Sequence, residues 1–306
     1  MSAISTGLIP VLVLILVGYV LKRASFLPEE AWSGMEKLTY YVLFPALLIQ
    51  TLANQSLVGM PWPSMLLVVV GTLLTAAMVL ILWHVMRASV SGATFTSIFQ
   101  GGVRFNTYIA LALALAFFGT DGLALAALAS GFMIILINLL CVSVLGIWGN
   151  SSKKDVTAFA RNVFGNPLLI SCAIGWVLSL SGIGLPGVSD NILEIIGRAA
   201  LPFGLLAVGA ALKPEAIGGH LRPIAISSLV QFGLKPIITL LLISITGLSG
   251  SAAGVLIISF MVPTAASAYI LAKQLGGDTE TMASIITFQT LLAFLIMPLI
   301  ALAVLT

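Results

Sequence analysis

Apolar runs of about twenty residues recur along the whole of this chain, and they decide what it can fold into. At about 1.5 Å per residue of helix, each run is long enough to cross a hydrocarbon core roughly 30 Å thick. Only 8% of the 306 residues are charged and 60% are hydrophobic, whereas an ordinary globular domain has roughly 25% charged residues. These 306 residues are therefore predicted to form an integral membrane protein without a soluble domain.

The runs predict ten transmembrane helices. Helices are favoured over a barrel because the runs lack the short alternating pattern of barrel strands, and because backbone groups facing lipid must be satisfied within the segment. The predicted spans are 4–21, 37–55, 63–86, 92–118, 122–148, 163–181, 190–212, 222–247, 249–272 and 280–305.

The net charge of +3 indicates topology rather than nucleic-acid binding. Ten helices place both termini on one side, and the basic residues of the loops fall on the opposite side. By the positive-inside rule both termini of this multi-pass membrane protein are predicted to face outward. The basic loop residues are Lys22, Arg23, Lys37, Arg87, Lys153, Lys154, Arg161, Lys213, Arg222 and Lys273.

An internal repeat is visible at an offset of 157 residues. At this single ungapped register the structure-breaking residues coincide: Pro10 with Pro167, Gly18 with Gly175, Pro45 with Pro202, Gly119 with Gly276, and Asp121 with Asp278. Each copy holds five predicted helices, and an odd number makes the second copy enter the membrane from the other side. We therefore expect two inverted repeats, 1–148 and 163–306, joined by a short cytoplasmic linker at 149–162.

The fourth and ninth predicted helices are both broken near mid-membrane. At the repeat offset Asn106 falls on Pro263; Gly101 and Gly102 weaken the fourth helix, and Pro263 removes a backbone N–H from the ninth. Such breaks are tolerated at this depth only where they line a cavity or are buried in protein. Equivalent breaks in inverted halves predict a binding site where the two helices cross.

Fresh helix starts are expected at both breaks. Asparagine suits an N-cap and proline a first helical position, so two helix N-termini would converge and offer N–H donors to an anion. Pro45 and Pro202 kink equivalent helices and either pack or line the cavity. The remaining polar candidates near the site are Tyr108, Thr264, Ser267, Tyr269 and Gln289.

Two basic residues lie deep in predicted spans. Arg104 is about 25 Å along a helix from Asp121, and its charge demands a partner or a wet cavity. It either binds a substrate carboxylate or bonds carbonyls freed by the break. Lys235 is expected either to contact the substrate or a gate, or to have a structural role.

The sequence resembles the auxin efflux carrier family, which includes bacterial malonate permease-like proteins and plant PIN-type carriers. The likeness covers the whole chain and rests on "LVGYVLKRASFLPEEAWSGMEKLTYYVLFPALLIQTLA", "RFNTYIA" and "PTAASAYILAKQLGGD". It implies a fold related to that of bile-acid sodium symporters, with helices four and nine crossing as an X and a scaffold moving against a transport domain. Asn106 stands where plant members are expected to carry proline, and the short middle loop favours a bacterial permease.

The predicted function is a carrier of small organic anions, such as mono- or dicarboxylates of the auxin or malonate type, working by alternating access. The expected partners are the anion and the lipid bilayer, with a homodimer left open; no nucleic acid, cofactor or metal is expected. An intramembrane enzyme is disfavoured because no predicted span holds a central Asp or Glu. A channel and a sodium-coupled symporter of the bile-acid type remain the alternatives.

Overall fold

The computed structural model describes residues 3–55, 59–87, 89–150 and 165–305, and all regular structure in these ranges is helical. The predicted all-helical fold is confirmed. Most of the predicted linker, with Lys153, Lys154 and Arg161, lies outside the described residues.

The helices follow one another with short connections. Their bounds are α1 Ala3–Arg23, α2 Glu29–Leu38, η1 Thr39–Leu43, α3 Phe44–Ala53, α4 Trp62–Arg87, α5 Gly92–Val103, α6 Thr107–Trp148, α8 Pro167–Leu180, α9 Ser189–Arg198, α10 Ala200–Ala210, η2 Pro214–Ile217, α11 Leu221–Leu229, η3 Val230–Leu234, α12 Lys235–Thr246, α13 Gly250–Met261, α14 Ser267–Leu275 and α15 Thr279–Leu305.

Five helical segments among the described residues are long and apolar enough to cross a membrane, and shorter apolar helices accompany them. Some of these segments include a short interruption of the helix, so that one segment contains two or more of the helices named above. The five are Trp62–Arg87, Gly92–Trp148, Ser189–Ala210, Leu221–Thr246 and Thr279–Leu299, and the shorter helices are Pro167–Leu180 and Gly250–Met261.

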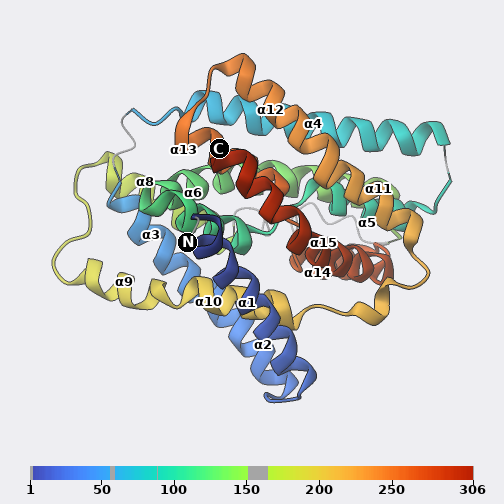
Figure 1. The fold of residues 1–306 in the computed structure, drawn as a ribbon, viewed down its shortest axis with the longest axis horizontal. Coiled ribbons are helices and arrows are strands. Elements are labelled where there is room, and N and C mark those ends of the chain that lie inside the picture. The colour runs from blue at the N-terminus through green and yellow to red at the C-terminus, as the bar shows by residue number, and fades with distance from the viewer. Residues whose placement is uncertain (1–2, 56–58, 88, 151–164, 306) are drawn as a thin grey trace.

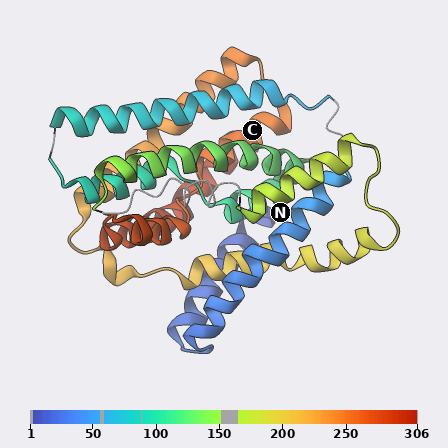
Figure 2. The same cartoon turned by 180° about the vertical axis from the view of Figure 1, so that it is seen from behind.

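The helices sort into two bundles (Figures 1 and 2). In the first bundle α1 packs on α10, and α3 packs on α8 and α9. In the second, α4 lies beside α12, α5 beside α11, and α6 beside α13, with α15 against α5 and α11. In Figure 1 the blue and yellow ribbons of the first bundle occupy the lower left. The helix α6 also contacts α1, α3, α8 and α10 of the first bundle.

Glycines allow close approach of helices in the first bundle. A Cβ on Gly18 of α1 would lie 2.1 Å from the carbonyl oxygen of Leu206 in α10, and one on Gly209 would lie 1.8 Å from that of Ile15. Gly175 of α8 brings that helix against α3 in the same way, 2.7 Å from Leu52 Cβ. Small residues are the usual means of close helix packing in membranes, where apolar side chains gain little by leaving lipid.

Element ends recur at, or within one residue of, the offset of 157 residues. The helix α5 ends at Val103 and α13 at Met261, 158 residues later, and each is followed by a short non-helical stretch and a new helix. Gly119, at a kink inside α6, has φ 64°, and Gly276, the C-cap of α14, has φ 75°. Left-handed backbone at these two positions favours glycine and separates each half-helix from the element after it.

Widened π-turns precede two of the membrane prolines. The π-helical turn η1 ends one residue before Phe44-Pro45, and η3 ends just before Lys235-Pro236. A proline lacks an N–H and its ring crowds the carbonyl four residues earlier, so a π-turn relieves the conflict without ending the helix. Pro202 lies in the first turn of α10, after the irregular residue Ala199.

Candidate functional site at the helix crossing

The two broken helices meet through their main chains. The backbone N–H of Asn106, between α5 and α6, donates to the carbonyl oxygen of Pro263, between α13 and α14, at 2.8 Å. Both residues are buried. Irregular backbone at this depth needs its polar groups satisfied inside the protein, and each break supplies one partner for the other.

Asn106 caps the half-helix that follows it. Its side-chain oxygen accepts hydrogen bonds from the N–H groups of Tyr108 at 3.1 Å and Ile109 at 3.2 Å. This is the N-cap arrangement expected for asparagine. The N-terminus of α6 therefore has two of its donors occupied by its own cap.

The N-terminus of α14 is more open. Thr264 N–H donates to Gln289 Oε1 at 3.1 Å, whereas the N–H groups of Ala265 and Ala266 have no acceptor in the described part of the chain. Both residues are half-buried. The two helix starts therefore differ in degree: Ala265 and Ala266 offer two free donors just before α14, whereas at the start of α6 the cap leaves Thr107 N–H as the donor without an acceptor among the described residues.

Two buried glutamines bond the carbonyls freed by the breaks. Gln289 of α15 donates from Nε2 to Gly101 O at 2.9 Å while accepting from Thr264, so it bridges both breaks. Gln231 of η3 donates to Val262 O at the end of α13. Both side chains are fully buried. Both glutamines donate hydrogen bonds to main-chain oxygen atoms at the helix ends, which lipid could not do.

Arg104 is buried at the C-cap of α5, with 9% of its surface exposed. Its Nη2 donates to Asn138 Oδ1 in α6 at 3.0 Å, and its Nη1 is buried with no partner among the described residues. The ion pairs in that part of the chain join other residues: Lys22 with Glu29, Arg23 with Glu215, and Arg198 with Glu194. Arg104 therefore keeps a charge and a donor without an acidic partner.

Gln100, one turn before Arg104, was missed by the sequence reasoning. Its side chain is fully buried, and neither its Oε1 nor its Nε2 has a partner among the described residues. The Arg104 N–H bonds to the Gln100 carbonyl at 2.9 Å, so the two side chains leave the helix one turn apart on the same face. The sequence does contain a signal for it: an amide side chain in an apolar span, four residues before a buried arginine.

Lys235 has its donors used within the protein. Its Nζ donates to Gln231 Oε1 at 2.7 Å, to Val103 O at 3.3 Å and to Arg104 O at 3.4 Å, and the side chain is fully buried. An ammonium has three donors. These contacts place the Lys235 ammonium group against the C-terminal end of α5.

Tyr108 joins the crossing to the first bundle. Its ring stacks on Phe44 of α3, with centroids 4.4 Å apart and planes 10° from parallel. Gly204 of α10 faces both rings, since a Cβ there would lie 3.0 Å from Phe44 Cε2 and 3.1 Å from Tyr108 Cγ. The residues that follow the first break thus touch two helices of the other bundle.

The other candidates lie around the crossing or beyond it. Ser267 begins α14 and is exposed, and Tyr269 packs below Lys213, whose Nζ is 5.7 Å from the ring centroid. Gly101 and Gly102 are inside the last turn of α5, where a Cβ would lie 2.6 Å from Ile285 Cγ2 and 2.9 Å from Leu80 Cδ1 respectively. The break itself follows them, at residues 104–106.

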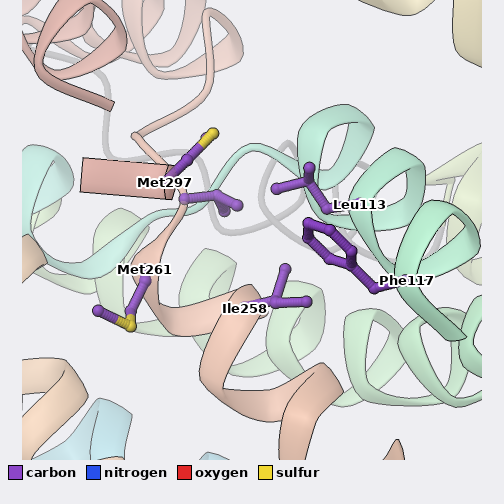
Figure 3. Close-up of a pocket in the computed structure, with 6 residues that line it drawn as sticks. Leu113, Phe117, Ile258, Met261 and Met297 are labelled. Carbon is purple, nitrogen blue, oxygen red and sulfur yellow. The ribbon is translucent and has the colours of Figure 1, made fainter. Parts of the chain in front are cut away.

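A small apolar cavity of about 10 Å³ adjoins the second break (Figure 3). Leu113 and Phe117 of α6 point into it, opposite Ile258 and Met261 of α13 and Met297 of α15. Its volume suits at most one water molecule. The protein is thus closely packed beside the end of α13.

Comparison with known proteins assigns the chain to a protein family. The profile of the family described as "Membrane transport protein" matches residues 3–301. An "Uncharacterized transporter" of Methanothermobacter thermautotrophicus is 23% identical over 295 residues, covering 94% of each chain. A "Putative malonate transporter" of Rhizobium meliloti is 25% identical over 300 residues, covering 94% of this chain and 92% of its own. The chain belongs to the membrane transport protein family, which is the auxin efflux carrier family that its sequence resembles.

Proposed function

We propose that this membrane transporter carries small organic anions, such as mono- or dicarboxylates, by alternating access around the crossing of its two broken helices. One observation carries the proposal. Arg104, two residues before the Asn106 that bonds Pro263, is buried and has a guanidinium nitrogen without a partner among the described residues.

The charge at the crossing favours an anion. Arg104 has no acidic partner among the described residues, and a cation at this depth is costly unless something compensates it. The free N–H groups of Ala265 and Ala266 add partial positive charge at the start of α14. A carboxylate accepts charge-assisted hydrogen bonds from a guanidinium and also accepts from backbone N–H groups, so it suits both kinds of donor.

Alternating access is supported by features that recur at 157 residues: the positive-φ glycines Gly119 and Gly276, and the hydrogen-bonded pair Asn106 and Pro263. We take residues 1–148 and 163–306 as two inverted repeats, joined at 149–162, which make up ten transmembrane helices. Two similar halves packed either way round give inward-open and outward-open states of comparable energy. The first bundle would act as a scaffold and the second would move against it, with the stack of Tyr108 on Phe44 at their boundary.

A malonate-like acid is the first substrate to test, because a relative at 25% identity carries that name. Purified protein should be stabilised against heating by malonate and not by a neutral diamide of the same size, since a ligand stabilises the state that it binds. Proteoliposomes should then take up the stabilising acid with saturable kinetics. Uptake that rises linearly with concentration would indicate a channel, and stabilisation by neither acids nor amides would contradict the proposed anion site.

We propose further that the protein lies in a bacterial inner membrane with both termini outside. The one-sided distribution of Lys and Arg in the predicted loops supports the orientation, and the similarity to a protein of Rhizobium meliloti supports the bacterial membrane. A C-terminal reporter that is active only in the cytoplasm would overturn this orientation.

A further inference from the structure

Lys235 is surrounded by oxygen atoms that belong to the protein itself. Three acceptors lie within 3.4 Å of its Nζ: one side-chain amide oxygen, from Gln231, and two main-chain carbonyl oxygens, from Val103 and Arg104. The ring centroid of Phe260 is 5.6 Å away. All three ammonium donors have an acceptor, so none is left for a substrate carboxylate.

No carboxylate compensates this charge among the described residues, where the ion pairs involve other cations. The compensation comes from dipoles instead. Val103 and Arg104 form the C-terminal end of α5, where carbonyl groups left without helical partners carry partial negative charge. Half-helix ends with unwound carbonyls are also where secondary transporters coordinate a coupling cation.

The sequence builds this arrangement with a π-turn. Gln231 lies inside η3, Val230–Leu234, and Lys235 follows it directly. The pair is linked by the 2.7 Å hydrogen bond between their side chains, and Gln231 also donates to Val262 at the end of α13. One helix therefore satisfies the carbonyl ends of both half-helices, one with an ammonium and the other with an amide.

We propose that the ammonium group of Lys235 is a tethered cation that occupies a monovalent-cation site formed by Val103 O, Arg104 O and Gln231 Oε1. The carrier would then need no separately bound Na⁺ or K⁺ at this position. The cation site follows from these contacts alone, whereas its consequence for transport rests on the proposed function.

Two variants separate a cation site from a simple packing role. Lys235→Ala removes the three outer methylenes and the ammonium, leaving the oxygen atoms and an empty space that propylammonium matches. Lys235→Met removes the charge but fills most of that space. Thermal unfolding of the purified wild-type protein and both variants is measured with choline chloride as the baseline salt. Propylammonium, Na⁺ or K⁺ chloride is then exchanged for choline at constant ionic strength.

We expect propylammonium to restore at least half of the melting temperature lost in Lys235→Ala, with saturation, and to leave the wild-type protein and Lys235→Met unchanged. Na⁺ or K⁺ should give a smaller effect in the same variant only. A Lys235→Ala protein that cannot be recovered folded in any of these salts, or one that all of them stabilise no more than Lys235→Met, would overturn the site. Stabilisation of the wild-type protein by Na⁺ or K⁺ over choline would do so as well.

A transport measurement tests the remaining part. Wild-type proteoliposomes loaded with choline should take up a substrate acid equally well from Na⁺, K⁺ and choline buffers. Strict dependence on Na⁺ would refute a tethered substitute while leaving anion transport intact. Absence of uptake under every condition would instead count against the proposed function, and the unfolding data would still decide the cation site.

Discussion

Asn106 donates its backbone N–H to the carbonyl oxygen of Pro263, and the same residue caps the next helix with its side chain. Asn106→Ala keeps the main-chain bond but removes the cap. We expect it to cost about 1 kcal/mol of stability, the usual value for a lost N-cap. The expected result is a lower melting temperature for Asn106→Ala and a nearly unchanged one for Asn106→Ser, whose hydroxyl can replace the acceptor. Equal losses in both variants would show that the cap is not what Asn106 contributes.

Pro263→Ala tests whether the second break itself is required. The substitution returns an N–H that can bond Ser259 O four residues earlier and lengthen α13, while the side chain becomes smaller and so cannot clash. We expect normal membrane insertion and about a tenfold loss of uptake, equivalent to 1.4 kcal/mol. Uptake is compared at equal amounts of folded protein, and wild-type uptake would mean that the break does not depend on proline.

Arg104→Gln tests the anion site. Glutamine keeps hydrogen-bonding capacity but carries no charge, so a carboxylate ligand should lose a charge-assisted bond worth about 1.5 to 3 kcal/mol, or about 10- to 150-fold in affinity. Melting temperature and ligand affinity are measured on the same sample. A destabilised variant with unchanged affinity would assign Arg104 to the fold instead. Asn138→Leu is the complementary variant, since it removes the partner of Arg104 and leaves the charge.

Gly204→Ala tests the boundary between the bundles. Its Cβ would lie 3.0 Å from Phe44 and 3.1 Å from Tyr108, so the stacked rings must shift by a few tenths of an ångström. Overpacking of this kind typically costs 1 to 3 kcal/mol, roughly. If the bundles move against each other, the uptake rate should fall more than ligand affinity. Gly146→Ala is the matched control, because a Cβ there meets nothing within 4 Å.

Asp278 predicts a dependence of stability on pH. Burial raises the pKa of its carboxyl, but hydrogen bonds from Thr281 and Thr94 outweigh burial, and the net shift of the pKa is downward. The ionised form therefore stabilises the fold above the unfolded pKa of about 3.9, and this contribution is lost as the pH falls through the lower folded value. The difference in unfolding midpoint between the wild-type protein and Asp278→Asn should be constant from pH 7 to about pH 5 and shrink below it. A difference that grows on acidification would contradict this sign.

The sequence predicts the helical class and the positions of the two breaks because both depend on local chemistry. Twenty apolar residues make a helix the only satisfied backbone in lipid. Asn106 and Pro263 are recognisable because one accepts N–H bonds at a helix start and the other lacks an N–H. These signals need no knowledge of what packs nearby.

The partners of the buried polar groups could not be predicted in the same way. The direction in which Gln100, Gln231 or Lys235 points depends on which helix lies beside it, and an almost uniformly apolar sequence carries little periodicity to decide this. The π-turn before Lys235 also changes the face on which the following residues lie. The assignment of Arg104 and the other site residues to substrate binding stays a prediction, and for Lys235 the three acceptors around its Nζ favour the structural alternative.

The glycine contacts of the first bundle bear on how the protein is made. Gly18 holds α1 against α10, and Gly175 holds α8 against α3, so each N-terminal helix packs on a partner from the other half of the chain. Neither half can complete its packing while it is alone in the membrane. During synthesis α1 and α3 are inserted before α8 and α10 have been translated. This bundle can therefore assemble only late, after its helices have been inserted into the membrane. The same reciprocity means that two separately translated halves have complementary surfaces through which they can find each other.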